Sequence, residues 1–270
     1  MTTRQSYGQP DRPLGHLTAD TPERRHMTRP AGTRRARGTP LTRAPQLADE
    51  VAAHLRDLIM SGEIWPGQYI RLDDVARELG VSVTPVREAL VRLRSEDMVE
   101  LEPRRGYVVN ALSQQDVRDL FDLQGHIAGE LAARAASTID RPHLTLLHDI
   151  QQALRNAVHA EDIDQVKRLE FEFHRVINRL AHARKLSWFL HTASRYTPGR
   201  FYSTDEAWRA DMLQRHDALL TALENKNTEE ARAITVRHFT DGADRLINHL
   251  AKLGMWRPHP VTPPHPRPPV

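Results

Sequence analysis

Residues 75–90 read VARELGVSVTPVREAL, and this stretch has the pattern of two short helices joined by a tight turn. The first helix is predicted over Asp73–Leu79, with Gly80 just past its end, where glycine readily takes the left-handed conformation that closes a helix. The second helix is predicted to begin with Thr84 as its N-cap and Pro85 at its first helical position, where the missing N–H costs nothing. The stretch therefore predicts a helix-turn-helix unit.

The sequence on either side extends this unit. Upstream, apolar residues recur at helical spacing and predict a helix that ends near Gly62, with a buried face made of Leu47, Val51, Leu55, Leu58 and Ile59. Downstream, residues 98–101 and 107–109 read as two short strands, joined by the loop 102–106, EPRRG. Three helices followed by a hairpin within about 65 residues is the arrangement of a winged helix-turn-helix domain.

The second helix has the features that reading DNA requires. Its apolar stripe, Val86, Leu90 and Leu93, faces the core and leaves its N-terminal end exposed. Hydroxyl groups and an arginine at a helix N-terminus can contact phosphates or base edges in the major groove. The predicted DNA-contacting residues are Ser82, Thr84 and Arg87 on this helix and Arg104, Arg105 and Gly106 on the wing. The alternative is a protein-interaction module, since helix-turn-helix shapes also occur there and surface arginines are often only solvated.

Residues 47–110 resemble the GntR family of bacterial transcription regulators. The likeness rests on four segments: IWPG at 64–67, VARELGVS at 75–82, TPVREAL at 84–90 and RRG at 104–106. The resemblance implies a homodimer that binds a double-stranded DNA operator with inverted-repeat symmetry. One position departs from the family pattern, since Val83 stands where arginine is usual. An operator sequence therefore does not transfer from the family.

The ends of the chain differ from its middle in composition. Of 18 prolines, six precede residue 47 and seven follow residue 257. Residues 1–46 carry nine arginines against three acidic residues, whereas the remaining 224 residues hold 29 Lys and Arg against 32 Asp and Glu. Neither end has hydrophobic periodicity, so we expect a disordered basic arm over 1–46 and a disordered Pro-rich tail over 253–270. The arm can add phosphate contacts, or it is a solvated extension.

Composition also narrows the class of protein. The chain has no cysteine, which excludes disulfides and thiolate metal sites and fits a reducing cytoplasm. No apolar run approaches the length needed to cross a bilayer, and residues 1–46 have no secretory signal pattern. We therefore expect a cytoplasmic protein with no membrane partner.

From about residue 113 only helical periods remain. The winged helix-turn-helix domain is assigned to 47–112 and an all-α helical bundle to 113–252. An apolar face made of Leu120, Leu123, Ile127 and Leu131 supports the bundle. Helices are expected at roughly 113–137, 141–160, 163–181, 184–196, 204–225 and 228–252.

Four side chains in the bundle form a candidate metal site. Glu170 and His174 are four residues apart in a helical stretch, so both project from one face, while His216 and His238 lie in two later helices. Helical bundles build metal sites from such pairs plus single ligands on facing helices. Imidazole with one carboxylate suits Zn, Ni or Mn. From spacing alone, the alternative is an exposed Glu–His pair and core histidines that satisfy carbonyls.

Residues 116–250 are similar to the FadR-type C-terminal domain, called FCD, of GntR regulators. This resemblance implies a divalent metal ion held through an Asp-x-x-x-His motif and two later histidines, which match Glu170, His174, His216 and His238 with glutamate in place of aspartate. The family frequently has an Arg and a Glu in the first bundle helix, where this chain has Gln124 and Ala128. Contacts that this Arg and Glu make in other family members therefore cannot be assigned to this chain.

These observations favour a ligand-responsive transcriptional repressor that senses a small carboxylate effector. Arg195, Tyr196 and Arg200 are candidates for neutralising such an acid, or they are simply loop residues near Pro198. The main alternative is a metal-dependent enzyme on the helical domain. Against it, the sequence has no His-Glu-x-x-His motif, no Gly-rich phosphate loop and no Gly-x-Ser-x-Gly elbow.

Overall fold

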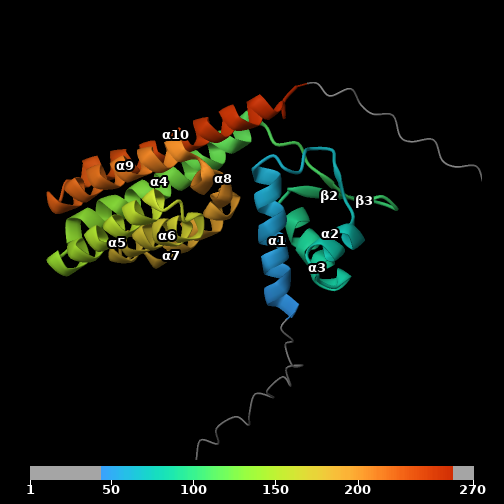
Figure 1. The fold of residues 1–270 in the computed structure, drawn as a ribbon, viewed down its shortest axis with the longest axis horizontal. Coiled ribbons are helices and arrows are strands. Elements are labelled where there is room, and N and C mark those ends of the chain that lie inside the picture. The colour runs from blue at the N-terminus through green and yellow to red at the C-terminus, as the bar shows by residue number, and fades with distance from the viewer. Residues whose placement is uncertain (1–43, 258–270) are drawn as a thin grey trace, which may run out of the picture. The chain divides into compact units, whose positions relative to one another are not determined.

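The computed structural model describes residues 44–257, and the chain in this range is mainly helical (Figure 1). The predicted arm over 1–46 and tail over 253–270 fall mostly outside these residues. Of their described parts, residues 44–46 belong to α1 and Leu253 ends α10. The first elements are α1 (Ala44–Met60), β1 (Tyr69–Ile70), α2 (Leu72–Glu78), α3 (Val83–Ser95), β2 (Val99–Glu102) and β3 (Gly106–Val109).

The predicted three helices and hairpin are present, which confirms the winged helix-turn-helix. A short strand that the sequence analysis missed, β1, completes an antiparallel sheet with the order β1-β3-β2. Tyr69 pairs with Val108, and Val108 also pairs with Glu100. Gly106 opens β3 at a φ of +102°, and its missing side chain leaves room for the Ile70 carbonyl. The hairpin thus turns tightly and presents its tip to solvent.

The predicted start of the second helix is wrong by two residues. α3 begins at Val83 with Ser82 in the N-cap position, so Thr84 is not the cap and Pro85 is the third helical residue. The N–H groups of the first helical turn have no partner within a helix, so proline is tolerated throughout that turn. A proline therefore places a helix start only to within one turn.

Most residues of the predicted buried faces are buried, but some leucines at the edges of these faces are not. Leu47 is 38% exposed and Leu58 is half-buried, because the face of α1 centres on Ala48. Leu123 is 52% exposed, since the buried stripe of α4 passes through Phe121 and Gln124 on either side of it. These three positions lie at the rim of the apolar stripes.

The second part of the chain is an all-helical bundle, as predicted. The predicted helix over 184–196 is in fact α7 followed by a separate 3-10 turn, and the helix expected from 204 begins at Glu206, where Asp205 accepts from the Trp208 N–H. The elements are α4 (Gln114–Thr138), α5 (Arg141–His159), α6 (Ile163–Leu180), α7 (Arg184–Ala193), η1 (Ser194–Tyr196), α8 (Gly199–Thr204), α9 (Glu206–Glu224) and α10 (Thr228–Leu253).

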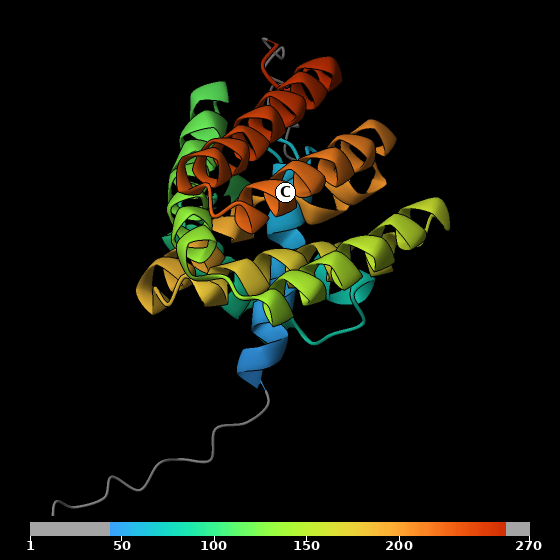
Figure 2. The same cartoon turned by 90° about the vertical axis from the view of Figure 1, so that its left-hand side faces the viewer.

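Helices α4 and α10 lie side by side along most of their length (Figures 1 and 2). Glycines of α4 allow this approach: a Cβ on Gly129 would lie 2.8 Å from Val236 Cγ2, and one on Gly125 would lie 3.1 Å from Phe239 Cβ. The interior holds Phe173 of α6, which is fully buried. Within residues 44–257, no helix is long and apolar enough to cross a membrane.

Candidate functional site

The predicted DNA-contacting residues of α3 share its exposed N-terminal end. Ser82, Thr84 and Arg87 are all exposed, while Val86 and Leu90 on the opposite face are fully buried. The helix therefore anchors one face in the core and offers a polar, cationic face, which is how a recognition helix is held.

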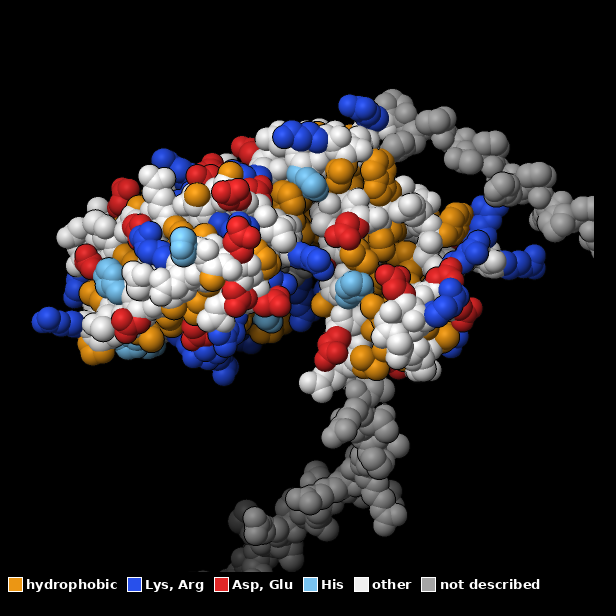
Figure 3. Space-filling view, in the orientation of Figure 1, with side chains coloured by type: hydrophobic (Ala, Val, Ile, Leu, Met, Phe, Trp, Pro, Cys, Tyr) orange, Lys and Arg blue, Asp and Glu red, His pale blue; other side chains and the backbone are white. Residues whose placement is uncertain are grey.

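The wing places two more cationic side chains in solvent. Arg104 and Arg105 are exposed, and Figure 3 shows Lys and Arg side chains gathered at the end of the β2–β3 hairpin. Arg105 Nη1 lies 3.3 Å from the Tyr69 hydroxyl and 3.6 Å from Glu102 Oε2, so its position is partly set by the sheet. Arg104 sits at a φ of +68° in the turn.

Val83 differs from its two exposed neighbours. It is half-buried and packs against the apolar core of the winged helix. A valine here stabilises the start of α3 and leaves the adjacent Ser82 and Thr84 as the hydrogen-bonding groups of this turn.

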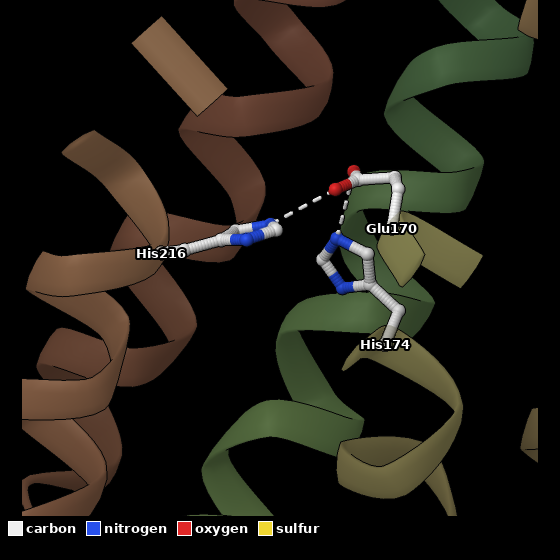
Figure 4. Close-up of side chains that lie close together, drawn as sticks. All are labelled: Glu170, His174 and His216. Atoms are coloured by element: carbon white, nitrogen blue, oxygen red, sulfur yellow. Dashed lines mark ion pairs between the residues drawn. The ribbon is translucent and has the colours of Figure 1, made fainter. Parts of the chain in front are cut away.

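Three of the predicted metal-binding side chains converge in the bundle. Glu170 and His174 project from the same face of α6, and His216 reaches them from α9 (Figure 4). His174 Nε2 lies 3.2 Å from Glu170 Oε1, and His216 Nε2 lies 3.3 Å from Glu170 Oε2. One ligand atom from each residue falls within 4.8 Å of the others. The structure thus brings together three of the four side chains that the spacing predicted as ligands, and their role as ligands stays a prediction.

The fourth predicted ligand, His238 of α10, lies at the edge of this cluster. Its Nε2 is 3.9 Å from Glu170 Oε1, and its ring centroid is 5.6 Å from that of His174. The group of ligand atoms within 4.8 Å of one another contains the other three residues and leaves His238 out.

A residue that the sequence analysis missed fixes the orientation of His216. Gln151 of α5 donates from Nε2 to the Leu213 carbonyl at 2.9 Å and to Asp217 Oδ1 at 3.0 Å. Its Oε1 must therefore accept the 3.1 Å hydrogen bond from His216 Nδ1, which makes Nδ1 the protonated nitrogen. The lone pair on Nε2 then points at the cluster. Nothing in the sequence signals Gln151, since it lies 65 residues from His216.

The pKa values of the cluster favour the forms that bind cations. Burial lowers the pKa of His216 to about 4 and that of His238 to about 3, although Glu170 opposes both shifts. Burial alone would raise the pKa of Glu170, but His216 and His174 outweigh it and hold that pKa well below its usual range. At neutral pH the cluster therefore contains a carboxylate and two neutral imidazoles, of which that of His216 is fully buried.

These side chains fit a divalent metal ion. Ligand atoms that lie about 2.1 Å from one ion in tetrahedral geometry are about 3.4 Å apart. Each histidine nitrogen lies at a similar distance, 3.2 or 3.3 Å, from one of the two Glu170 oxygens. Buried polar atoms without a hydrogen-bond partner are rare in folded proteins, yet each of the four predicted ligand residues has one. They are Glu170 Oε2, His174 Nε2, His216 Nε2 and His238 Nδ1.

A cavity of about 610 Å³ adjoins the cluster, and Glu170, His174 and His238 form part of its wall. The three predicted effector residues, Arg195, Tyr196 and Arg200, are not among its lining residues. Of the two positions in α4 that depart from the family pattern, Ala128 lines the cavity and Gln124 does not. Gln124 is fully buried and accepts a hydrogen bond from Thr197 Oγ1 at 2.9 Å.

Both parts of the chain match known protein families. Residues 47–109 match the family described as bacterial regulatory proteins, gntR family, and residues 119–241 match the FCD domain. The chain belongs to the GntR family of bacterial transcription regulators and carries an FCD domain, as the resemblance predicted. This family consists of transcription regulators and not of enzymes, which excludes the metalloenzyme alternative.

Similar proteins agree with this assignment. An uncharacterized HTH-type transcriptional regulator of Mycobacterium tuberculosis is 24% identical over 80% of this chain and 85% of its own length. The HTH-type transcriptional repressor RspR of Escherichia coli is 27% identical over 69% of this chain and 83% of its own length. Among solved structures, E. coli McbR/YncC has a TM-score of 0.59 at 21% identity, covering 75% of this chain and 97% of that one. This last likeness concerns the fold.

Proposed function

We propose that this GntR-family regulator is a metal-containing, ligand-responsive repressor. In this proposal, residues 47–112 bind an inverted-repeat operator as a homodimer, and residues 113–252 hold a divalent ion (Zn, Ni or Mn) and sense a small organic acid. The observation that carries the proposal is that Glu170, His174 and His216 converge, with buried ligand atoms that lack hydrogen-bond partners, beside a cavity large enough for a ligand, whose wall includes Glu170 and His174. The bound ion would supply positive charge at that wall.

Repression is proposed from similar proteins. RspR and the gluconate operon repressor of Bacillus subtilis, 32% identical over 48% of this chain and 53% of its own length, are both named as repressors. A ligand can relieve repression only through different affinities for the DNA-competent and DNA-incompetent states. The cytoplasm, where DNA is available, is the proposed location.

Metal analysis of the purified protein tests the site directly. We expect about one divalent ion per chain in the wild type and strong loss of metal in Glu170→Ala and His216→Ala. His126→Ala, which removes an exposed histidine from α4, is the matched control and should keep its metal. Full metal content in both site variants would refute the assignment.

The DNA-binding part is tested by footprinting on the chain's own upstream region. We expect protection of two half-sites related by two-fold symmetry and about one helical turn apart, because a dimer places two recognition helices in successive major grooves. Protection of a single, unrepeated site would contradict the homodimer.

A further inference from the structure

The wall of the cavity beside the metal cluster is mainly apolar. Helix α4 contributes only Phe121, Ala128 and Ala132 to it, and Trp208 and Phe239 add aromatic surface. At about 610 Å³, the cavity is in the size range of sites that take drug-sized molecules, and an acid of two to four carbon atoms would leave much of it empty. Its occupant should therefore carry a substantial apolar body.

One cationic side chain of this wall is buried without an anionic partner. Arg209 of α9 is 8% exposed, and its Nη1 donates to the Ser203 carbonyl at 2.9 Å. Its Nε has no hydrogen-bond partner, and no carboxylate within residues 44–257 forms an ion pair with it. Because a guanidinium stays charged at physiological pH, this leaves a positive charge uncompensated in a low-dielectric site.

Of the other arginines near this region, three are paired, and Arg179, which lines the cavity, is exposed to solvent. Arg215 of α9 lies 2.8 Å from Asp241, and Arg245 of α10 lies 2.7 Å from Asp205. Arg175, which also lines the cavity, forms an ion pair with Glu172. Lys167 also faces the cavity but is exposed to solvent. Arg209 is thus the buried charge on this wall that still lacks a counterion.

We propose that Arg209 binds the anionic group of the effector, and that the effector is an amphipathic organic carboxylate whose apolar body packs against Phe121, Trp208 and Phe239. The inference rests on the proposed function, since it specifies the ligand of the same sensor domain. A carboxylate satisfies a guanidinium through two parallel charge-assisted hydrogen bonds, which a neutral ligand does not offer. Recognition by Arg209 is independent of any contact the acid makes to the metal.

The first test measures the stability of the ligand-free protein. Replacing Arg209 by methionine keeps most of the side-chain volume and removes the uncompensated charge, so Arg209→Met should raise Tm by a few degrees. Arg215→Met is the matched control on the same helix and should lower Tm, because it leaves Asp241 without its partner. An unchanged or lower Tm for Arg209→Met would overturn the proposal.

The second test measures ligand binding by calorimetry. The probes are octanoate and 3-phenylpropanoate, each compared with its neutral amide, on metal-loaded and metal-free protein. We expect both acids to bind the wild type, and Arg209→Gln to weaken that binding about 10- to 100-fold in both metal states while leaving amide binding unchanged. Arg237→Gln, which changes an exposed arginine of α10, should bind like the wild type. The proposal fails if neither acid binds the wild type, or if Arg209→Gln binds them equally well.

Operator binding separates this inference from the proposed function. If the acids bind through Arg209 but leave operator affinity unchanged, the inference stands and the proposed ligand response fails. If an acid releases the operator equally from the wild type and Arg209→Gln, the ligand response stands and the role of Arg209 fails.

Discussion

The side-chain amide of Gln151 fixes which nitrogen of His216 is unprotonated and faces the cluster. Because Gln151 donates to both Leu213 and Asp217, its oxygen is committed to the Nδ1 proton of His216. Such supporting hydrogen bonds hold a ligating imidazole in one tautomer and one orientation. The aromatic ring of Phe173 stacks on the same imidazole, with 3.9 Å between ring centroids, and further restricts its orientation.

Gln151→Leu should therefore weaken metal binding without removing a ligand. We expect a loss of about 10- to 100-fold in affinity, as is typical when the partner of a ligating histidine is removed. Competition with a chromophoric chelator measures it. Gln152→Leu changes the next, exposed residue of α5 and should bind metal normally. Equal affinities of the two variants would show that Gln151 does not orient His216.

At the DNA surface, Arg87 is the residue with the clearest expected effect. It is exposed near the start of α3, so it can reach a base edge while the helix remains anchored by Leu90. If it reads a base, Arg87→Ala should cost about 1–3 kcal/mol of operator affinity at fixed salt and relax specificity at one position of each half-site. Quantitative mobility shifts with a set of single-base operator variants test this. If Arg87→Ala bound the operator as tightly as the wild type, α3 would not be the helix that reads the DNA sequence.

Among the elements, α4 and α10 show how small residues determine packing. A Cβ on Gly129 would approach both Val236 Cγ2 and the Arg232 carbonyl, at 2.8 and 3.2 Å. The glycine weakens α4 as an isolated helix, by about 1 kcal/mol relative to alanine, but it allows close contact with α10.

Gly129→Val should destabilise the bundle by about 1–3 kcal/mol, because overpacking of a tight interface outweighs any gain in helix propensity. Urea unfolding followed by circular dichroism measures the free energy of unfolding. Asp122→Val adds the same side chain at an exposed position of α4 and should change stability much less. Equal effects would show that the α4–α10 contact tolerates the added volume.

The elements also show which features the sequence could predict. Within residues 44–257, hydrophobic periodicity found every helix of ten residues or more, since each buries one apolar stripe. It missed β1, because two residues carry no periodic signal, and it misplaced the start of α3, because proline is tolerated anywhere in a first turn. The Glu170–His174 pair could be found because both residues lie on one helix. Gln151 and Arg209 could not, since their roles depend on contacts between helices.

At the scale of the whole molecule, the buried histidines link folding to pH. In the metal-free protein His216 and His238 stay neutral in the folded state, with pKa values of about 4 and about 3. In the unfolded chain both histidines become protonated below about pH 6.5, whereas in the folded chain they stay neutral until a much lower pH. The unfolded state therefore binds more protons than the folded state in this range. Glu170 acts in the same direction at lower pH, because its pKa is held below the usual carboxyl range in the folded state.

The free energy of unfolding of the chelator-treated protein should therefore fall as pH decreases from about 6.5 towards 4. Each histidine contributes up to about 1.4 kcal/mol per pH unit in this window. His216→Gln lacks one of the two histidines that take up a proton only in the unfolded chain, so its free energy of unfolding should fall less steeply with decreasing pH. The control His126→Gln should follow the wild type. Urea titrations at several pH values give the three slopes. Bound metal should flatten the wild-type curve until protons displace the ion, because the metal and the protons compete for the same lone pairs. Parallel slopes for the wild type and His216→Gln would mean that His216 is protonated as readily in the folded chain as in the unfolded one.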